Sequence, residues 1–302
     1  MLKIKAPATA ANLGPGFDCL GIALDLYNTV MVRPRDGSGI SIEIYGEGEK
    51  ILSRKEDNLV YQAYKSFYRR INQVPPAVDL QLYNQIPLAS GLGSSAAAIT
   101  AGLVAGNVLS GHNLPLTTLL DLAIELEGHP DNVAPAMFGG LVVACGRSDL
   151  LGYHCLKLNV PEDLYAVVCV PDFSVSTEEA RGVLPVKVPF ADAVFNVARV
   201  ALLLGALQNK RWDVLSDAMQ DRLHLPYREA LVPGMESVFA QARRAGAIGA
   251  TLSGSGPTVL ALVNKASDGI GVGTAMEKAF SSMGISSRTF TLAISSKGVE
   301  AV

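Results

Sequence analysis

Residues 87–98 read Pro-Leu-Ala-Ser-Gly-Leu-Gly-Ser-Ser-Ala-Ala-Ala, and they are the most informative stretch of this 302-residue sequence. An alternating pattern typical of a strand precedes them, and an apolar helical pattern follows. Gly91 and Gly93 carry no Cβ atom, so backbone N–H groups can converge there on an anion. Ser94 and Ser95 stand where the helix N-cap is expected, and a helix N-terminus attracts phosphate. The stretch therefore predicts a phosphate-binding loop.

These residues alone also allow other interpretations of the loop. It is not a Walker A loop, because no Lys follows Gly93. It matches the G-x-G-x-x-A fingerprint of dinucleotide-binding proteins through Gly91, Gly93 and Ala96, but that site also uses an acidic residue about 20 positions later. No Asp or Glu occurs over 97–120, so an oxidoreductase is disfavoured. A tight helix-start turn without any ligand is the third interpretation.

Two further loops of small residues favour a ligand-binding loop over a turn without a ligand. One is Pro7-Ala-Thr-Ala-Ala-Asn-Leu-Gly-Pro-Gly-Phe-Asp18, near the start of the chain. The other is Gly249-Ala-Thr-Leu-Ser-Gly-Ser-Gly-Pro257, near its end. Each leaves room for something other than side chains. Three such loops in one chain indicate a single shared ligand cavity.

The periodicities predict an α+β fold in two halves, 1–150 and 151–302, with the ligand in the crevice between them. Residues 1–90 have mainly strand patterns around one helix. The helices are expected at 58–71, 96–109, 115–127, 191–222, 227–245 and 268–283. The strands are expected at 40–45, 78–82, 164–170, 258–263 and 288–294. Ser176-Thr-Glu-Glu179 has the form of a capping box, so a further helix that carries Arg181 is expected to begin there.

The composition excludes several classes of protein. Hydrophobic residues make up 49% and charged residues 18%, which is typical of a globular chain, and the net charge of −3 gives no reason to expect nucleic acid as a partner. The four cysteines show neither a C-x-x-C nor a zinc-binding spacing, so free thiols in a reducing compartment are expected. The start of the chain lacks the apolar run of a signal peptide, and the apolar stretch at 95–109 is too short to span a membrane. The expected location is the cytoplasm, without membrane attachment.

With three small-residue loops in this order, the sequence resembles the GHMP kinases, the superfamily of galactokinase, homoserine, mevalonate and phosphomevalonate kinases. The motif that carries the resemblance is Pro-x-x-x-Gly-Leu-Gly-Ser-Ser-Ala at 87–96. The homoserine branch is indicated by 7–21, His129-Pro-Asp-Asn-Val-Ala-Pro-Ala-Met-Phe-Gly-Gly140, the Ser176–Pro185 stretch and Leu225-Pro-Tyr-Arg228. The resemblance implies a ribosomal-protein-S5-like first half, a ferredoxin-like second half and a homodimer. It also implies ATP-dependent phosphorylation of the L-homoserine hydroxyl to O-phospho-L-homoserine, a step of threonine biosynthesis.

The resemblance implies a role for each site residue, and the residue type alone often allows a simpler alternative. Glu127 lies in the last turn of its helix, where the helix dipole disfavours a negative charge, so it is either a solvated helix-end residue or a ligand. The resemblance makes it a Mg²⁺ ligand together with Ser95, or alternatively Ser94, and it makes residues 87–97 the ATP-binding loop. The ATP-binding residues implied are Pro87, Leu88, Ala89, Ser90, Gly91, Leu92, Gly93, Ser94, Ser95, Ala96 and Ala97. The loop from Glu127 to His129 is shorter than in some relatives, which bears on the metal geometry.

The amino-acid acceptor needs groups of both charges. A carboxylate suits Arg and an ammonium suits a carboxylate. The resemblance assigns the substrate carboxylate to Arg181 and Arg228, although either could be a surface arginine. It also implies the substrate-binding residues Thr9, Asn12, Asp18, His129, Asn132, Ser255 and Gly256, the last two in a loop that closes over the ligands. Asp18 and Asn12 could instead stabilise their own turn.

The proton acceptor is the uncertain role. Mevalonate-kinase-like members have an Asp near the acceptor hydroxyl, where this sequence has Asn132, which cannot take a proton at neutral pH. Asp131 is adjacent in sequence, but it could point the other way. The expectation is therefore direct attack by the hydroxyl on the γ-phosphorus, with Asn132, Glu127 and Ser95 as the catalytic residues and no strong protein base.

Other residues that attract attention have simpler interpretations. His224 is expected to be structural. Ser255 is not a hydrolase nucleophile, because Ser253 stands where the nucleophile elbow requires Gly. The rival functions are a GHMP kinase for mevalonate-like or sugar substrates, which lack an ammonium group for Asp18, and a non-catalytic ligand-binding protein.

Overall fold

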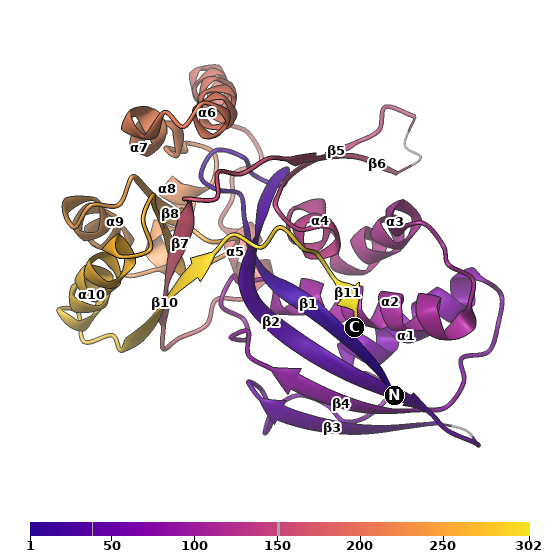
Figure 1. The fold of residues 1–302 in the computed structure, drawn as a ribbon. Helices are drawn as coiled ribbons and strands as arrows, with labels where there is room; N and C mark the ends of the chain where they lie inside the picture. Colours follow the sequence, from indigo (N-terminus) through magenta and orange to yellow (C-terminus); the bar gives the residue numbers. More distant parts are fainter. Residues whose placement is uncertain (38, 150–151) are drawn as a thin grey trace.

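The computed structural model describes residues 1–37, 39–149 and 152–302. It is an α+β fold built on two sheets, as the periodicities predicted, and the sheets lie next to each other with helices on their outer sides (Figure 1). The two chain ends lie close together, beside the first sheet (Figure 1). The site lies where loops of the two sheets meet.

The first sheet has seven strands. Four of them lie in the order β11-β1-β2-β4 with β3 beyond β4, and β2 also pairs with β5, which pairs with β6. All neighbours are antiparallel except β3 and β4. The register of β1 against β2 shifts between Pro7 and Ala8, at a residue that cannot donate a ladder hydrogen bond. The strands are β1 (Leu2–Ala11), β2 (Leu20–Pro34), β3 (Ile40–Gly46), β4 (Val78–Asn84), β5 (Leu141–Gly146), β6 (Tyr153–Leu158) and β11 (Glu300–Ala301).

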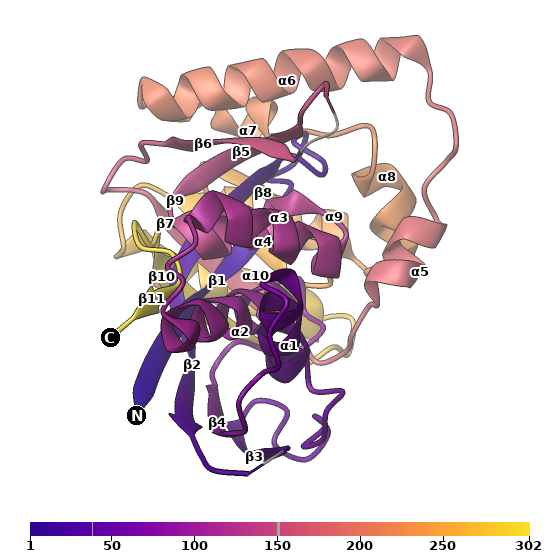
Figure 2. The same cartoon turned by 90° about the vertical axis from the view of Figure 1, so that its right-hand side faces the viewer.

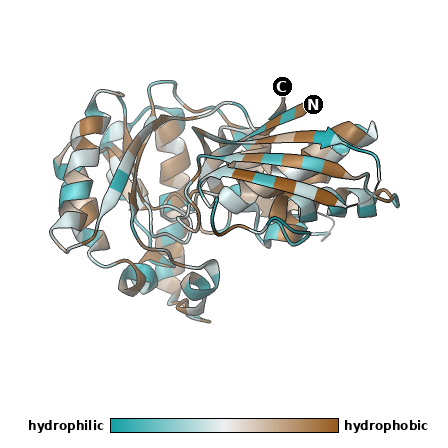
Figure 3. Ribbon diagram, turned by 90° about the horizontal axis from the view of Figure 1, so that it is seen from below, coloured by the Kyte–Doolittle hydropathy of each residue, from teal (hydrophilic) through white to brown (hydrophobic). Residues whose placement is uncertain are grey.

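Four helices cover one face of this sheet, and the largest core lies between them and the strands. They are α1 (Leu59–Arg70), α2 (Ser94–Ser110), α3 (Leu116–Glu127) and α4 (Pro130–Phe138). Hydrophobic and hydrophilic residues alternate along the strands, as the colour bands in Figure 3 show. The alternation lets one face of the sheet join the core while the other stays polar.

The second sheet has four antiparallel strands in the order β10-β7-β9-β8. They are β7 (Tyr165–Pro171), β8 (Gly249–Leu252), β9 (Val259–Val263) and β10 (Ser287–Ala293). Both faces are buried in β7, β8 and β9, whereas the edge strand β10 is partly exposed. On β7, Ala166 and Val168 join the core of the first half, while Val167 and Cys169 join a second core under α9 (Met235–Arg244) and α10 (Asp268–Ser281). The second sheet therefore separates the two hydrophobic cores.

The remaining helices follow β7 in the chain. They are α5 (Thr177–Gly182), α6 (Phe190–Gln208), α7 (Leu215–Ala218) and α8 (Leu225–Arg228), with 3-10 turns η1 (Trp212–Val214) and η2 (Glu229–Leu231). Two of them, α5 and α8, carry residues that line the site cavity. The Ser176 hydroxyl accepts from the Glu179 N–H and the Glu179 carboxylate accepts from the Ser176 N–H, so the predicted capping box forms. Asn58 caps α1 by accepting a hydrogen bond from the Val60 N–H.

Two local expectations were wrong. The N-cap of α2 is Gly93, in the left-handed conformation, and Ser94 and Ser95 are already helical. The helix expected over 191–222 ends at Gln208, and shorter turns follow.

The predicted division between residues 150 and 151 falls outside the described residues. The strand that follows, β6, pairs with β5 of the first sheet, and the last strand of the chain, β11, returns to pair with β1 of the same sheet. The C-terminal end of the chain thus supplies an edge strand of the first sheet. The division into halves stays a prediction.

Helix α6 lies along the outside of the molecule (Figure 2). Among the described helices it is the one long and apolar enough to cross a membrane by length and composition, although a single such helix is weak support for a membrane span. The apolar stretch weighed from the sequence for a membrane span, 95–109, lies in α2 instead. One side of α6 packs onto the protein through Leu203, Ala206 and Leu207.

Candidate active site

The three loops of small residues meet at one place. The Ser253 hydroxyl donates to the Gly91 carbonyl at 2.7 Å, and the Thr258 N–H donates to the Ser90 carbonyl at 3.1 Å. The Asn12 side-chain amide donates to the Gly254 carbonyl at 3.1 Å. These bonds join segments more than 150 residues apart in sequence. The fold therefore brings the three loops together at one place, as the sequence predicted.

A cavity of about 570 Å³ opens between the loops, at the junction of the two sheets. Polar loop residues line one part of it, and apolar residues line another. Its lining consists of Asn12, Phe17, Asp18, Asn28, Ile51, Leu52, Asn58, Leu59, Val60, Leu82, Asn84, Leu88, Ala89, Ser90, Gly91, Gly93, Ser94, Ser95, Ala98, Glu127, His129, Asp131, Asn132, Val175, Ser176, Thr177, Arg181, Arg228, Gly254 and Ser255. The size and the mixed lining suit a small-molecule site.

The N-terminus of α2 opens into this cavity. Gly93 has φ +67°, and a Cβ there would lie 1.9 Å from the Thr9 hydroxyl oxygen, so only glycine allows this approach. The first turn of α2 holds Ser94 and Ser95, and the first N–H groups of a helix have no partner within it. Backbone donors and the positive end of the helix dipole therefore face the cavity together, which is an anion-binding arrangement.

Glu127 lies at the end of α3, opposite that N-terminus. Its carboxylate accepts a hydrogen bond from the Ser95 hydroxyl at 2.5 Å. The described residues contain no group of three or more His, Cys, Asp or Glu side chains able to hold a metal. Mg²⁺ usually keeps water and phosphate oxygens and takes only one or two protein ligands, so one carboxylate and one hydroxyl fit it.

Helix α4 brings two polar side chains to the cavity. Asn132 accepts a hydrogen bond at its Oδ1 from the Thr9 hydroxyl at 2.8 Å, which fixes the orientation of its amide. Asp131 is buried and lies 2.6 Å from Nδ1 of His129. Burial alone would lower the pKa of His129, but the hydrogen bond and the charge of Asp131 outweigh it and raise that pKa. Asp131 is therefore already engaged by an imidazole.

An ion pair closes the far side of the cavity. Arg181, on α5, donates from Nη1 and Nη2 to the two carboxylate oxygens of Asp18, at 3.0 and 2.8 Å. This bidentate contact raises the pKa of Arg181. Asp18 is itself held by a bond from its N–H to Oδ1 of Asn12 at 3.0 Å. A guanidinium and a carboxylate thus face each other where a zwitterion could insert.

Arg228, on α8, is a buried cation that is only 2% exposed. Its guanidinium donates to two neutral carbonyl groups, Nε to Ala180 at 3.2 Å and Nη1 to Gly254 at 2.9 Å. Burial, and next the charge of Arg181, lower the pKa of Arg228 to about 10. A buried charge is costly without an anion, so this site favours an anionic ligand.

Comparisons with known proteins identify the family of this chain. The family description GHMP kinases N terminal domain matches residues 58–140, and GHMP kinases C terminal matches 203–282. The homoserine kinase of Carboxydothermus hydrogenoformans is 48% identical over 94% of this chain and 91% of its own length. That of Microchaete diplosiphon is 44% identical over 100% and 97%.

The chain belongs to the homoserine kinase family of the GHMP kinases. Its structure is similar to that of homoserine kinase from Cytophaga hutchinsonii, with a TM-score of 0.90 at 34% identity over 100% of this chain and 97% of the other. Mevalonate kinase from L. major shares the fold, with a TM-score of 0.73 at 17% identity over 97% and 96% of the two chains. The predicted superfamily and branch are confirmed.

Most residues that the family resemblance singled out line the cavity of this homoserine kinase family member, and a few do not. Thr9, Leu92, Ala96 and Ala97 are fully buried beneath the loop. Thr9 contacts the site through Asn132 rather than directly. Pro87 faces a neighbouring surface groove. Gly256 lies outside the lining, beside Ser255.

Two parts of the site were not predicted from the sequence. Phe17 lies next to both Arg181 and Arg228, with its ring centre 5.6 and 5.3 Å from the two guanidinium carbons. An apolar wall, formed by Ile51, Leu52, Leu59, Val60 and Leu82, lines the other end of the cavity. Apolar residues of this kind look like core in a sequence, so no local signal marks them. Phe17 lay within a quoted motif, but its type gave no hint of a contact with cations.

Proposed function

We propose that this protein is a homoserine kinase, which transfers the γ-phosphoryl group of ATP to the side-chain hydroxyl of L-homoserine. The products are ADP and O-phospho-L-homoserine, and the reaction belongs to threonine biosynthesis. The observation that carries the proposal is a single cavity with an anion-binding helix N-terminus on one side and a buried arginine beside an Arg–Asp pair on the other. Relatives 42–48% identical over nearly the whole chain support it.

The amino-acid part of the acceptor matches the charges at the Asp18 end. Its carboxylate is expected between Arg228 and Arg181, and its ammonium against Asp18. Because Asp18 and Arg181 contact each other in the structure, the incoming zwitterion replaces part of that ion pair with equivalent contacts. Mevalonate and sugars lack the ammonium group, so they leave Asp18 without a partner.

The nucleotide is expected along the loop 87–97 and the apolar wall. The triphosphate would lie at the α2 N-terminus, and the base would contact the wall of Ile51, Leu59 and Val60. Glu127 and Ser95 would hold Mg²⁺. When bound, the ion neutralises charge on the phosphate oxygens.

Phosphoryl transfer needs positioning more than covalent chemistry from the protein. The homoserine oxygen forms a bond to the γ-phosphorus while the bond from that phosphorus to the ADP oxygen breaks. The hydroxyl proton leaves to a phosphate oxygen or to water. Asn132 orients the hydroxyl, and Asp131 is already hydrogen-bonded to His129, which supports direct attack without a strong protein base.

A coupled assay of ADP release tests the proposal. Purified protein and ATP with Mg²⁺ are mixed with L-homoserine, mevalonate, galactose or no acceptor. Release that depends on homoserine alone is the expected result. Release with mevalonate or galactose instead would move the assignment to another GHMP kinase. No release with any acceptor would favour a ligand-binding protein.

We also infer that the protein acts in the cytoplasm as a homodimer. The four cysteines are free thiols, which suits a reducing compartment. On α6 the outward residues recur at the 3.5-residue spacing of a helix pair, and Phe190 and Val197 are 85% and 72% exposed. A second copy of the same helix would cover this face. Sedimentation of the wild type and of Val197→Glu tests this, because the charge should convert dimers to monomers.

A further inference from the structure

A buried polar network lies behind Arg228, on the side away from the cavity. His224 is fully buried, and its Nε2 lies 2.7 Å from the carbonyl oxygen of Gly14. A carbonyl only accepts, so Nε2 carries the proton and donates. Nδ1 is then left with its lone pair. The imidazole therefore presents a donor to the first loop and an acceptor to its other neighbour.

That other neighbour is the guanidinium of Arg228. Its Nη1 lies 3.3 Å from Nδ1 of His224 and 2.9 Å from the Gly254 carbonyl oxygen, while Nε donates to Ala180. The Nε–H group and both N–H groups of Nη1 are thereby directed into the protein. Nη2 has no acceptor among the described residues, and Arg228 lines the cavity. The network fixes the side of the guanidinium that faces the substrate site.

His224 is itself held from two directions. The carboxylate of Asp221 accepts from the backbone N–H groups of Leu223, His224 and Leu225, at 3.1, 2.8 and 2.7 Å. Asn196 on α6 donates from Nδ2 to Asp221 at 2.6 Å. The turn that leads into α8 is therefore locked by one buried carboxylate.

The neutral imidazole suits this place. Burial lowers the pKa of His224, which keeps Nδ1 unprotonated. The charged groups around the ring are Asp221, Arg228 and Asp18. Phe17 closes the remaining side, with its ring centre 5.2 Å from that of His224. A proton on Nδ1 would remove the acceptor and place two cations together.

We propose that His224 is a positioning residue for substrate recognition: through Nδ1 it holds the Arg228 guanidinium in the orientation that receives the carboxylate of the amino-acid acceptor. This inference rests on the proposed function and deepens it. From the sequence His224 was expected to be structural, and its complete burial agrees with that; the proposal adds a role in recognition. The role is specific to the carboxylate end, so the nucleotide end of the cavity does not depend on it.

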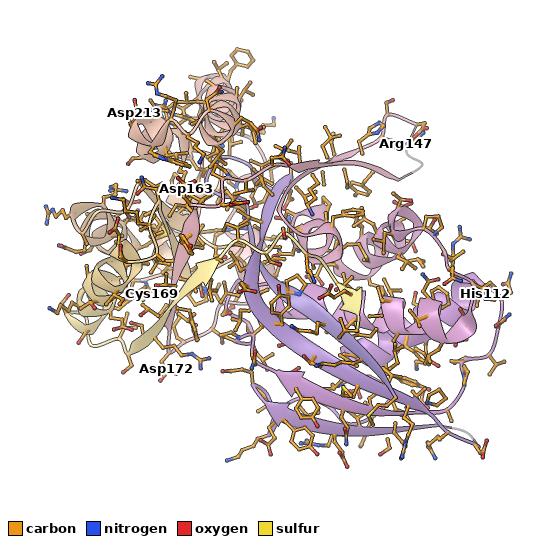
Figure 4. The ribbon with its side chains drawn as sticks, in the orientation of Figure 1. His112, Arg147, Asp163, Cys169, Asp172 and Asp213 are labelled. Carbon is orange, nitrogen blue, oxygen red and sulfur yellow. The ribbon has the colours of Figure 1, made fainter. Side chains whose placement is uncertain are left out.

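Two variants separate the two hydrogen bonds of the ring. His224→Gln places its amide near the position of Nε2, so it keeps a donor to Gly14 and loses the acceptor for Arg228. His224→Asn places its amide near Nδ1, so it keeps the acceptor and loses the donor. Each loses one buried hydrogen bond, so their effects on stability are matched. His112→Gln is the control, on an exposed connection at the opposite end of the molecule from α9 and α10 (Figure 4).

The expected result is a split in the kinetic constants. In His224→Gln the KM for L-homoserine rises about tenfold, the loss carried by one hydrogen bond to a charged group, while kcat and the KM for ATP stay within about twofold. His224→Asn and His112→Gln stay within about threefold of the wild type in all three. For 3-aminopropan-1-ol, which has the same amine and alcohol without the carboxylate, His224→Gln equals the wild type.

A binding measurement keeps the test independent of turnover. Calorimetry with L-2-aminobutyrate, which has the amino-acid head group but no hydroxyl, should show the same tenfold weakening in His224→Gln. Equal losses in the Gln and Asn variants, or losses that also affect the KM for ATP, would overturn the proposal and leave His224 with a folding role. If the wild type fails to phosphorylate homoserine, the proposed function fails. The Gln-to-Asn comparison of L-2-aminobutyrate binding still decides the role of His224.

Discussion

At the scale of single residues, the site is defined by charges that the fold leaves incompletely matched. Arg228 is buried among neutral carbonyl groups, whereas Arg181 has Asp18 as its partner. The same residue type therefore serves two purposes in one cavity. A buried cation without a carboxylate destabilises the empty protein, and an anionic ligand relieves that cost.

Arg228→Met should weaken recognition of the acceptor without preventing folding. Removing one partner of a buried charge pair costs about 2–5 kcal/mol, so the KM for L-homoserine should rise about a hundredfold. Arg222→Met is the matched control, because Arg222 is about half exposed and pairs with Asp192. Steady-state kinetics of both variants would measure this. An equal effect of the two substitutions would contradict the role of Arg228.

Glu127→Gln should raise the Mg²⁺ concentration needed for activity. The amide keeps the size of the side chain but loses the charge, and we expect an increase of about ten- to a hundredfold in the concentration for half-maximal rate. Glu125, two residues earlier on α3, is exposed and lies outside the cavity, so Glu125→Gln is the control. Activity is titrated against free Mg²⁺. An unchanged requirement in Glu127→Gln would remove Glu127 from the metal site.

Asn132→Ala tests whether the reaction uses a side-chain base. If Asn132 only orients the hydroxyl, kcat should fall by less than about a hundredfold. A fall of about 10⁴-fold or more would exceed the usual contribution of a general base and would contradict direct attack. Thr9→Val is the companion variant, since it removes only the bond to Asn132 Oδ1. Single-turnover measurements separate the chemical step from product release.

At the scale of elements, the important feature is how helix α2 begins. Its N-terminus faces the cavity because Gly93 adopts a left-handed conformation and packs directly on Thr9. The other end of the same helix stops at Gly111, also left-handed, with φ +70°. The two glycines share a conformation and differ in their surroundings.

This difference gives a matched pair of substitutions. A Cβ at Gly93 meets the Thr9 hydroxyl oxygen at 1.9 Å, whereas a Cβ at Gly111 has no described atom within 4 Å. Gly93→Ala should displace the phosphate loop and lower kcat/KM for ATP about a hundredfold. Gly111→Ala should cost about 1 kcal/mol of stability from the left-handed backbone and leave activity unchanged. Nucleotide kinetics and urea unfolding of both variants are the measurements, and equal kinetics would contradict the close-packed loop.

At the scale of the whole molecule, the end of the chain holds the site helix in place. The Val299 N–H donates to the Ala136 carbonyl of α4 at 2.7 Å, and β11 completes the first sheet beside β1. Lys157 donates to the carbonyls of Phe138 and Ser296, which ties β6 to the same segment. The helix that carries Asn132 is thereby supported by residues that are distant in sequence.

Val299→Asp should therefore destabilise the entire protein. The side chain is 8% exposed, and a charge there lacks a described partner, so we expect a loss of about 3 kcal/mol in the free energy of unfolding. Lys297→Ala is the control, because the Lys297 side chain is exposed and its loss should cost less than about 0.5 kcal/mol. Urea unfolding followed by circular dichroism measures both. A separate early transition for the chain end would argue against its role in the core.

The sequence by itself determined the α+β class, the family, most of the helices and, among the strands, β3, β4, β7, β9 and β10. Local signals were sufficient there, because alternation, capping residues and glycine loops act within a few residues of each other. Only the tertiary structure decided that Arg181 faces Asp18, that Arg228 is buried beside His224 and that Phe17 lies next to both guanidinium groups. It also decided that β11 belongs to the first sheet. These contacts join segments far apart along the chain, and their geometry depends on how the layers pack, which no local pattern encodes.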